Sequence, residues 1–210
     1  MNNNPEESCF FSIFFIRLQI GNYKNTTDMT QHPLEKFRFC PLCGTKAFVE
    51  NDTKSKRCKD CGFVYYFNPS ASTVAVIVNE RDELLVVRRA KEPACGTLDL
   101  PGGFCDCHET SEEGVVREVK EETGLCVDCA TFLFTIPNIY PYGGLDIHTI
   151  DQFFLCHVKG TAEAVAADDA AEILWLPWAE VKAEQFGLKS ISQGVERLLQ
   201  MRAESHATGR

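Results

Sequence analysis

The most constraining feature of the sequence is a segment of 23 residues, 103–125, that contains six Glu and one Asp. Three of these glutamates, Glu118, Glu121 and Glu122, are spaced i, i+3 and i+4, so a helix would place them on one face. Like charges at this spacing repel one another and destabilise an isolated helix. Hard divalent cations such as Mg²⁺ bind carboxylate oxygens and complete their coordination with water and substrate phosphates. The segment therefore indicates metal-assisted chemistry on a phosphate.

The same segment carries the start and stop signals of a helix over residues 111–123. Thr110 with Glu113 three residues later fits a capping box, and Gly124 fits a C-terminal stop. An apolar face beside the carboxylates is supplied by Val115, Val116 and Val119. A charge-rich helix stabilised only by internal ion pairs would leave the carboxylate cluster unexplained. We therefore expect one side of the helix to pack on a core and its acidic side to face a cleft.

Fixed spacings connect this helix to the residues that precede it. Gly103 is followed after five residues by Glu109, and after seven more by the run REVKEETGL at 117–125. Leu-Pro-Gly at 100–102 comes directly before. The pattern resembles a complete Nudix box. The resemblance implies an α/β fold, an α/β/α sandwich with a mixed sheet, and Mg²⁺- or Mn²⁺-dependent hydrolysis of a nucleoside diphosphate linked to another moiety X.

The resemblance also assigns roles to residues of the box. Glu118 and Glu122 would be ligands of Mg²⁺ or Mn²⁺, with the Gly103 carbonyl near the same ion. Glu121 would be a further ligand or the base that activates water. Bound cations would lower the pKa of a water molecule and orient the diphosphate.

Further residues around the box receive supporting roles from the same resemblance. Arg117 would anchor and orient Glu109 and its neighbours. Glu172 lies where relatives often place another acidic side chain near the metals, and it is either a base or ligand, or a solvated loop carboxylate. Arg88 and Arg89, at the end of an expected strand, would hold phosphate through two parallel hydrogen bonds, although ordinary surface charges explain them almost as well.

Two C-x-x-C pairs, separated by fourteen residues, precede the box, and each pair is followed by Gly. Their members are Cys40, Cys43, Cys58 and Cys61. Four thiolates at this spacing indicate a closed tetrahedral Zn²⁺ site with a structural role. Redox dithiols or disulfides are the alternative, which a cytosolic location disfavours. The module resembles the zinc ribbon that precedes the catalytic domain in the NADH pyrophosphatase branch of the Nudix family.

The chain has 210 residues, enough for one medium domain and a small module. We expect an N-terminal extension at 1–33, disordered or a non-native start, a zinc ribbon at 34–68 and a Nudix hydrolase domain at 69–210. The apolar run at 9–20 is interrupted by Arg17 and falls short of the ~20 residues that span a bilayer. Acidic residues precede it, unlike a signal peptide. A cytoplasmic location without a membrane partner is therefore expected.

The net charge of −9 argues against nonspecific binding to nucleic acid, which requires clustered Lys and Arg. A small nucleotide-diphosphate substrate, held by metal and local basic residues, is compatible with this charge. Relatives of the Nudix family are often dimers, and the sequence leaves a homodimer open.

The choice of substrate depends on residues that follow the box. The NADH pyrophosphatase branch carries a Ser-Gln-Pro-Trp-Pro-Phe-Pro array there, which this chain lacks. Pro141 and Tyr142, sixteen and seventeen residues past the box, resemble marker positions of ADP-ribose pyrophosphatases and of diadenosine polyphosphate hydrolases, respectively. Tyr140 and Tyr142 either stack on a base or pack within their loop.

ADP-ribose or a related nucleotide sugar is therefore the expected substrate. NADH or NAD pyrophosphatase activity and diadenosine polyphosphate hydrolysis are the enzymatic alternatives. A Nudix-fold sensor that binds a nucleotide metabolite without catalysis is the non-enzymatic alternative, and the intact glutamates of the box argue against it.

Apolar patterning predicts the remaining elements. Strands are expected at 74–78, 84–88, 98–100, 131–136, 149–158 and 173–176, and a final helix is expected at 190–203. The first two strands, with a turn at 79–82, are expected to pair. Residues 137–144 are expected to form a loop rich in Pro, Tyr and Gly.

Overall fold

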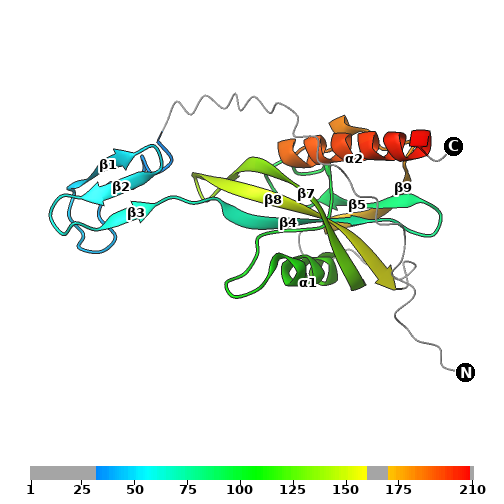
Figure 1. Cartoon of the computed structure of the whole chain (residues 1–210), viewed down its shortest axis with the longest axis horizontal. Coiled ribbons are helices and arrows are strands. Elements are labelled where there is room, and N and C mark those ends of the chain that lie inside the picture. Colours follow the sequence, from blue (N-terminus) through cyan, green and yellow to red (C-terminus); the bar gives the residue numbers. More distant parts are fainter. Residues whose placement is uncertain (1–31, 160–169, 209–210) are drawn as a thin grey trace, which may run out of the picture.

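The computed structural model describes residues 32–159 and 170–208 (Figure 1). The expected N-terminal extension, apart from its last two residues, lies outside these ranges, as does the apolar run at 9–20. Within the described ranges, no helix is both long and apolar enough to cross a membrane.

A small antiparallel sheet with strand order β1-β2-β3 forms one end of the molecule (Figure 1). Its strands are β1 (Phe48–Asp52), β2 (Ser55–Cys58) and β3 (Val64–Tyr66). Two cysteines and a phenylalanine form its buried core, with two more phenylalanines packed beside them: Cys40, Phe48, Cys58, Phe37 and Phe63. The module contacts the larger domain through Lys36, whose ammonium donates to the Gly144 carbonyl.

Within the part of the chain that the structure describes, the larger domain contains two three-stranded sheets and two long helices. Its elements are β4 (Ser70–Ile77), β5 (Glu83–Arg89), β6 (Leu98–Asp99), α1 (Ser111–Thr123), β7 (Cys126–Tyr142), β8 (Leu145–Lys159), β9 (Ala170–Pro177), the 3-10 helix η3 (Ala183–Gln185) and α2 (Lys189–Thr208). The strand orders are β4-β8-β7, in which β4 and β8 are parallel, and β6-β5-β9, which is antiparallel. Helices α1 and α2 lie on opposite sides of the layer formed by these strands (Figure 1). The predicted α/β/α sandwich with a mixed sheet is confirmed.

Alternate side chains of β4 enter two separate cores, because successive residues of a strand point to opposite faces. Val74 and Val76 belong to the core beneath α2, whereas Ala75 and Ile77 belong to the core beneath α1. All four are buried. A strand covered on both faces needs apolar residues at every position, which explains the uninterrupted apolar run in the sequence.

The expected pairing of the first two strands of this domain is wrong. β4 pairs along Ser70–Ile77 with β8, and β5 pairs with β6 and β9. An isolated bridge from Val78 to Leu84 links the ends of β4 and β5. Both strands are buried on both faces, so local patterning does not distinguish which neighbour each one takes.

The expected loop at 137–144 is also wrong for most of its length. Residues 137–142 continue β7, and the turn is confined to Gly143 and Gly144, both with positive φ. β7 lies at the edge of its sheet, beside β8, where a proline can be accommodated without breaking a ladder on both sides. Pairing with β8 therefore extends the strand through Pro137 and Pro141.

Helix α2 packs closely against Phe153 of β8 at Gly194. A Cβ atom at this position would lie 2.2 Å from Cζ of Phe153, a ring that is fully buried. Gly194→Ala should lower the free energy of unfolding, because overpacking costs about 1–3 kcal/mol. This exceeds the helix-propensity gain of about 1 kcal/mol. Urea unfolding measures the change. The exposed Gln200→Ala on the same helix is the control, and equal stability of both variants would contradict this packing.

Candidate active site

Helix α1 has both of its predicted end signals. Thr110 Oγ1 accepts from the Glu113 backbone N–H at 3.2 Å, and the Glu113 carboxylate accepts from the Thr110 N–H at 2.7 Å. Gly124 adopts a left-handed φ of 71° and ends the helix. The predicted bounds, 111–123, are confirmed. These caps fix the register of the helix and therefore which carboxylates share its exposed face.

The guanidinium of Arg117 forms hydrogen bonds with three carboxylates of the acidic segment. It donates to Glu109 through Nη2 at 2.7 Å and Nε at 3.2 Å. Its Nη1 donates to Glu118 at 2.8 Å and to Glu121 at 3.0 Å. Nη2 also donates to the Phe104 carbonyl at 3.0 Å, which ties the helix to the loop before it. The expected anchoring of Glu109 by Arg117 agrees with this geometry.

The loop that precedes the helix brings backbone groups to the remaining carboxylates. The Gly102 N–H donates to the buried Glu122 at 3.1 Å. A Cβ atom at Gly103 would lie 2.6 Å from Glu118 Oε1, so only glycine lets the backbone approach this carboxylate so closely. The Gly103 carbonyl accepts from the Thr73 N–H at 2.8 Å, which fixes the loop against β4.

Charge and burial shift the pKa values of this cluster in opposite directions. Hydrogen bonds from Arg117, together with the Asp106 N–H, hold the pKa of Glu109 below its ordinary value. Burial raises the pKa of Glu118, and Arg117 only partly offsets this effect. The pKa of Arg117 is raised chiefly by its hydrogen bonds to Glu109. A divalent cation near Glu118 would favour its ionised form.

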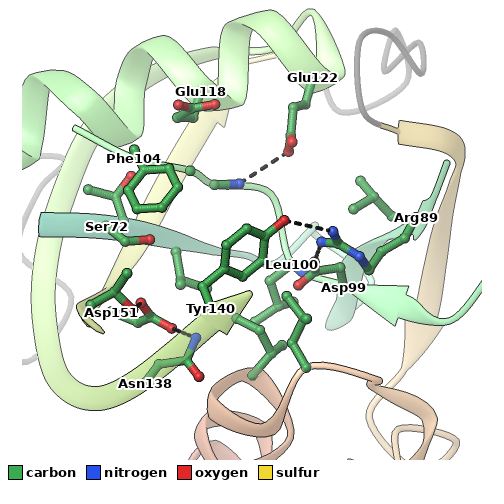
Figure 2. A pocket seen from close by; sticks show the side chains of 18 of the residues that line it. Ser72, Arg89, Asp99, Leu100, Phe104, Glu118, Glu122, Asn138, Tyr140 and Asp151 are labelled. Atoms are coloured by element: carbon green, nitrogen blue, oxygen red, sulfur yellow. Dashed lines mark hydrogen bonds and ion pairs between the residues drawn. The ribbon is translucent and has the colours of Figure 1, made fainter. Parts of the chain in front are cut away.

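A cavity of about 500 Å³ extends from these carboxylates toward the start of α2 (Figure 2). Several of the residues assigned from the sequence line it: Arg89, Gly103, Arg117, Glu118, Glu121, Glu122, Tyr140 and Tyr142. A volume of this size is typical of small-molecule sites. The structure therefore brings the acidic face of α1 and the two tyrosines of β7 into one cavity.

Arg89 is held by one buried and two half-buried partners at the wall of this cavity. Its guanidinium forms an ion pair with Asp99, which is nearly inaccessible to solvent. It also donates to the Tyr140 hydroxyl at 3.4 Å and to the Pro93 carbonyl at 2.7 Å. Tyr140 in turn stacks with Tyr142, with ring centroids 6.5 Å apart. Arg89 therefore positions the tyrosine side chain as well as presenting charge to the cavity.

Arg88 and Glu172 lie apart from the other predicted residues. They form an ion pair with each other at 3.0 Å across β5 and β9, with side chains 40% and 51% exposed. Arg88 also donates to the Gly96 carbonyl at 3.0 Å. Neither residue belongs to the set that lines the cavity. Arg88 lies outside the cavity because successive side chains of a strand point to opposite faces, so Arg88 and Arg89 lie on different sides of β5.

Several polar residues of the cavity were not predicted from the sequence: Asp99, Asn138, Thr149 and Asp151. A usable signal exists for two of them, because Asp99 stands between two leucines and Asp151 precedes Gln-Phe-Phe-Leu in an apolar strand. An ionisable residue inside a buried strand is a candidate functional group. Asn138 and Thr149 have no local signal, since β7 and β8 bring them together.

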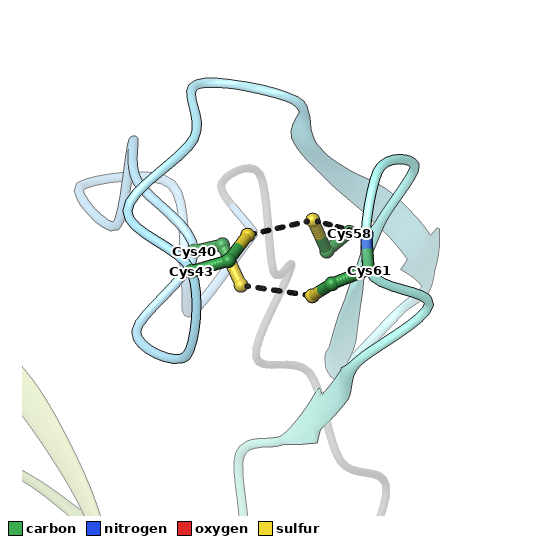
Figure 3. A group of neighbouring side chains, drawn as sticks. All are labelled: Cys40, Cys43, Cys58 and Cys61. Carbon is green, nitrogen blue, oxygen red and sulfur yellow. Dashed lines mark hydrogen bonds between the residues drawn. The ribbon is translucent and has the colours of Figure 1, made fainter.

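The four cysteines of the small module face one another (Figure 3). Their sulfur atoms all lie within 4.8 Å, with Cys40–Cys61 at 3.7 Å and Cys43–Cys58 at 3.6 Å. Sulfurs bound to one zinc at ~2.3 Å would be ~3.8 Å apart in a tetrahedron, so the donor set fits this ion. The Cys61 N–H donates to the Cys58 sulfur at 3.4 Å and lowers the pKa of that thiol to about 7.

Comparison with protein families assigns both parts of the chain. The NUDIX domain model matches residues 68–195, and the NADH pyrophosphatase zinc ribbon domain model matches residues 35–66. The chain therefore belongs to the Nudix hydrolase family and carries a zinc ribbon of the NADH pyrophosphatase type. The predicted family and fold class are confirmed.

Two curated relatives are named for different activities. An ADP-ribose pyrophosphatase of Methanocaldococcus jannaschii is 39% identical over 109 residues, which cover 51% of this chain and 61% of the relative. The NAD-capped RNA hydrolase NudC of Photobacterium profundum is 26% identical over 152 residues, which cover 72% of this chain and 54% of the relative. The chain thus spans about half the length of the curated relatives that it matches.

Solved structures share the fold. A Nudix hydrolase from Nitrosomonas europaea superposes with a TM-score of 0.60 at 19% identity, covering 80% of this chain and 93% of that chain. The MutT protein from Methanosarcina mazei Go1 superposes with a TM-score of 0.55 at 25% identity, covering 66% of this chain and 99% of that chain.

The pairing of Arg117 with Glu109 should make stability depend on pH. The folded-state pKa of Glu109 lies below its ordinary value of 4.5, so the pairing stabilises the fold fully above about pH 4.5. This contribution is lost as the pH falls through the lowered folded-state value. Arg117→Gln should therefore be less stable than the parent protein at pH 6, and the difference should shrink toward pH 3. Urea unfolding across this range measures it.

The exposed Arg81→Gln serves as the control for this experiment. It removes the same charge, and among the described residues Arg81 forms no ion pair with the acidic segment. A stability difference for Arg117→Gln that stays constant from pH 6 to pH 3 would contradict the pairing.

Proposed function

We propose that the protein hydrolyses, with Mg²⁺ or Mn²⁺, a nucleoside diphosphate linked to another moiety, with ADP-ribose or a related nucleotide sugar as its substrate. The observation that carries the proposal is the set of carboxylates on α1 that opens into a cavity of about 500 Å³. A diphosphate needs cationic charge, and these carboxylates can supply it by holding divalent ions. Aromatic and polar residues at the rest of the cavity fit a nucleoside.

Within this proposal, Glu118 and Glu122 hold the metal ion beside the Gly103 carbonyl. The chemistry of the donor set fits, because hard cations bind oxygen ligands and this loop gives its backbone close access to Glu118. When bound, the ion would supply charge that stabilises the phosphoryl oxygens and lowers the pKa of a water molecule. Arg117 keeps the carboxylates in place and supports Glu109 as part of the same assembly.

Glu121 is proposed as a further ligand or as the base that takes a proton from the attacking water. One of its oxygens accepts from Arg117, which leaves the second oxygen available as an acceptor. Arg89 is proposed to attract phosphate, and Tyr140 and Tyr142 to contact the base. Arg88 would reach phosphate, and Glu172 would serve as base or ligand, after their mutual ion pair opens.

ADP-ribose is supported by the relative from Methanocaldococcus jannaschii, which is named ADP-ribose pyrophosphatase. A second candidate is hydrolysis of NADH, NAD or NAD-capped RNA, which the matching zinc ribbon and the NudC relatives favour. Hydrolysis of diadenosine polyphosphates and binding without catalysis are the further alternatives. The test is a panel of ADP-ribose, NADH and diadenosine polyphosphate with Mg²⁺ and with Mn²⁺, with AMP release measured chromatographically. Tight binding of these compounds without turnover would identify a sensor and overturn the proposal.

Replacing Glu122 by Gln should leave the protein folded but lower turnover of the preferred substrate by about 100-fold or more, the scale of losing one major electrostatic element. The amide has the shape of the carboxylate but lacks its charge. Glu112→Gln, an exposed position in the first turn of the same helix, is the matched control and should keep parental turnover. Near-parental turnover of Glu122→Gln would refute its assignment as a metal ligand.

The four cysteines are proposed to hold Zn²⁺ for folding. The buried core of the module is small, so its stability must come largely from another source such as a metal. We infer that residues 34–68 and 69–210 fold as separate units.

A cytoplasmic location is part of the proposal. All ten cysteines in the described ranges are free thiols, and reduced cysteines are compatible with the cytoplasm.

Removing zinc with a chelator should unfold the small module while the larger domain stays folded. Zinc content by mass spectrometry and amide resonances by NMR measure the two effects. Cys58→Ser should lose zinc without a chelator, whereas Cys95→Ser, at an exposed position outside the module, should retain one zinc per chain. A native ribbon spectrum after complete zinc removal would contradict the structural role.

A further inference from the structure

A buried carboxylate lies in the same cavity, on a different element from the acidic helix. Asp151, in the middle of β8, is 4% exposed and is among the residues that line the cavity. Thr149 Oγ1 donates to one of its oxygens at 2.6 Å, and Asn138 Nδ2 donates to the other at 3.1 Å. Figure 2 shows Asp151 and Asn138 on the opposite side of Tyr140 from Glu122.

Asp151 makes no direct ion pair in the part of the chain that the structure describes. Its partners are a hydroxyl and an amide, which are neutral. Burying a carboxylate without a cation is costly unless hydrogen bonds satisfy it. Neutral side chains would be enough to link β7 to β8. The charge of the Asp151 carboxylate therefore indicates a further hydrogen-bond donor that a bound ligand supplies.

The orientation of the neighbouring amide defines what such a ligand must present. Asn138 Oδ1 accepts from the Ile139 N–H at 2.8 Å, which directs its NH₂ group to Asp151. Each carboxylate oxygen accepts one bond from the protein and keeps further acceptor capacity. The second N–H of Asn138 remains a donor. The cavity therefore offers a strong pair of acceptors beside one donor.

An aminopurine matches this arrangement. Adenine presents its 6-amino group beside a ring nitrogen acceptor, and guanine presents its 2-amino group and N1–H beside O6. In both cases the amino group would donate to Asp151, and the acceptor of the base would face Asn138. Leu188 and Ile191, at the start of α2, line the cavity and supply apolar surface for the faces of the ring.

We propose that Asp151, oriented by Thr149 and Asn138, accepts the exocyclic amino group of a purine and so selects aminopurine nucleotides over hypoxanthine nucleotides. This inference rests on the proposed function, because the carboxylates of α1 place the diphosphate at the other end of the cavity. Replacing the amino group of adenine by a carbonyl oxygen sets an acceptor against the carboxylate. Removing the 2-amino group of guanine deletes one of two charge-assisted hydrogen bonds.

The test compares kcat/KM for ADP-ribose, GDP-ribose and inosine diphosphate ribose. The parent protein should prefer an aminopurine substrate over the inosine compound by about tenfold or more, the scale of one good base contact. The preference between ADP-ribose and GDP-ribose identifies which purine the site binds. Asp151→Asn should abolish or reverse the preference over the inosine compound. In the adenine orientation its amide can donate to the hypoxanthine O6, and in the guanine orientation it loses the charge that favours the 2-amino group. Asp146→Asn, an exposed position on the same strand, should keep the preference.

Calorimetric binding of AMP, GMP and IMP separates this inference from the proposed hydrolysis, because it needs no turnover. Preference for AMP or GMP without hydrolysis of any substrate would support the base site and reject only the proposed function. If Asp151→Asn does not fold, Thr149→Val removes a donor to Asp151 while conserving shape, and it should weaken the preference. Equal binding of IMP and the aminopurine nucleotides by the parent protein would overturn the inference.

Discussion

The interaction between Arg117 and the carboxylates of its own segment is the constraint on which the rest of the site depends. One guanidinium contacts Glu109, Glu118 and Glu121, at distances between 2.7 and 3.2 Å. Without this cation, like charges one turn apart on α1 would repel. The planar guanidinium can donate to several carboxylates at once in a fixed geometry, which a lysine ammonium cannot do. The arrangement keeps the acidic face assembled, while Glu122 accepts from the Gly102 backbone N–H.

The helix can carry this charge because its other face is firmly packed. Val115 and Val119 are fully buried beneath the sheet, and the loop at 101–105 bonds to β4 through its carbonyls and amides. Gly102 and Gly103 bring backbone groups against Glu122 and Glu118. Apolar packing on one side therefore positions ionisable groups on the other, and the cavity extends from them along β7 and β8.

Local features of the fold could be predicted from the sequence, whereas strand pairing could not. The bounds of α1 follow from Thr110, Glu113 and Gly124, because caps and stops act over a few residues. The strand that pairs with β4 cannot be predicted from local patterning, because a strand buried on both faces can pair with either β5 or β8. The length of β7 does not follow either, because pairing with β8 outweighs the tendency of Pro137 and Pro141 to interrupt a strand.

The candidate site likewise has one part that can be predicted from the sequence and one part that cannot. Its acidic end is local, because one helix and its preceding loop contain Glu109, Arg117, Glu118 and Glu122. Its other end depends on the register of two strands, which places Asn138 opposite Thr149 and thus beside Asp151. Likewise, the sequence does not distinguish Arg89 from Arg88, whereas the structure places Arg89 at the cavity and pairs Arg88 with Glu172.

The central claim is that the acidic face of α1 binds a divalent cation. The most direct measurement is anomalous X-ray diffraction from crystals soaked in Mn²⁺, recorded at a wavelength where manganese scatters anomalously. We expect an anomalous peak coordinated by Glu118 and Glu122 beside the Gly103 carbonyl. Full occupancy of manganese elsewhere, with the Arg117 ion pairs intact and no anomalous peak at these carboxylates, would contradict the account.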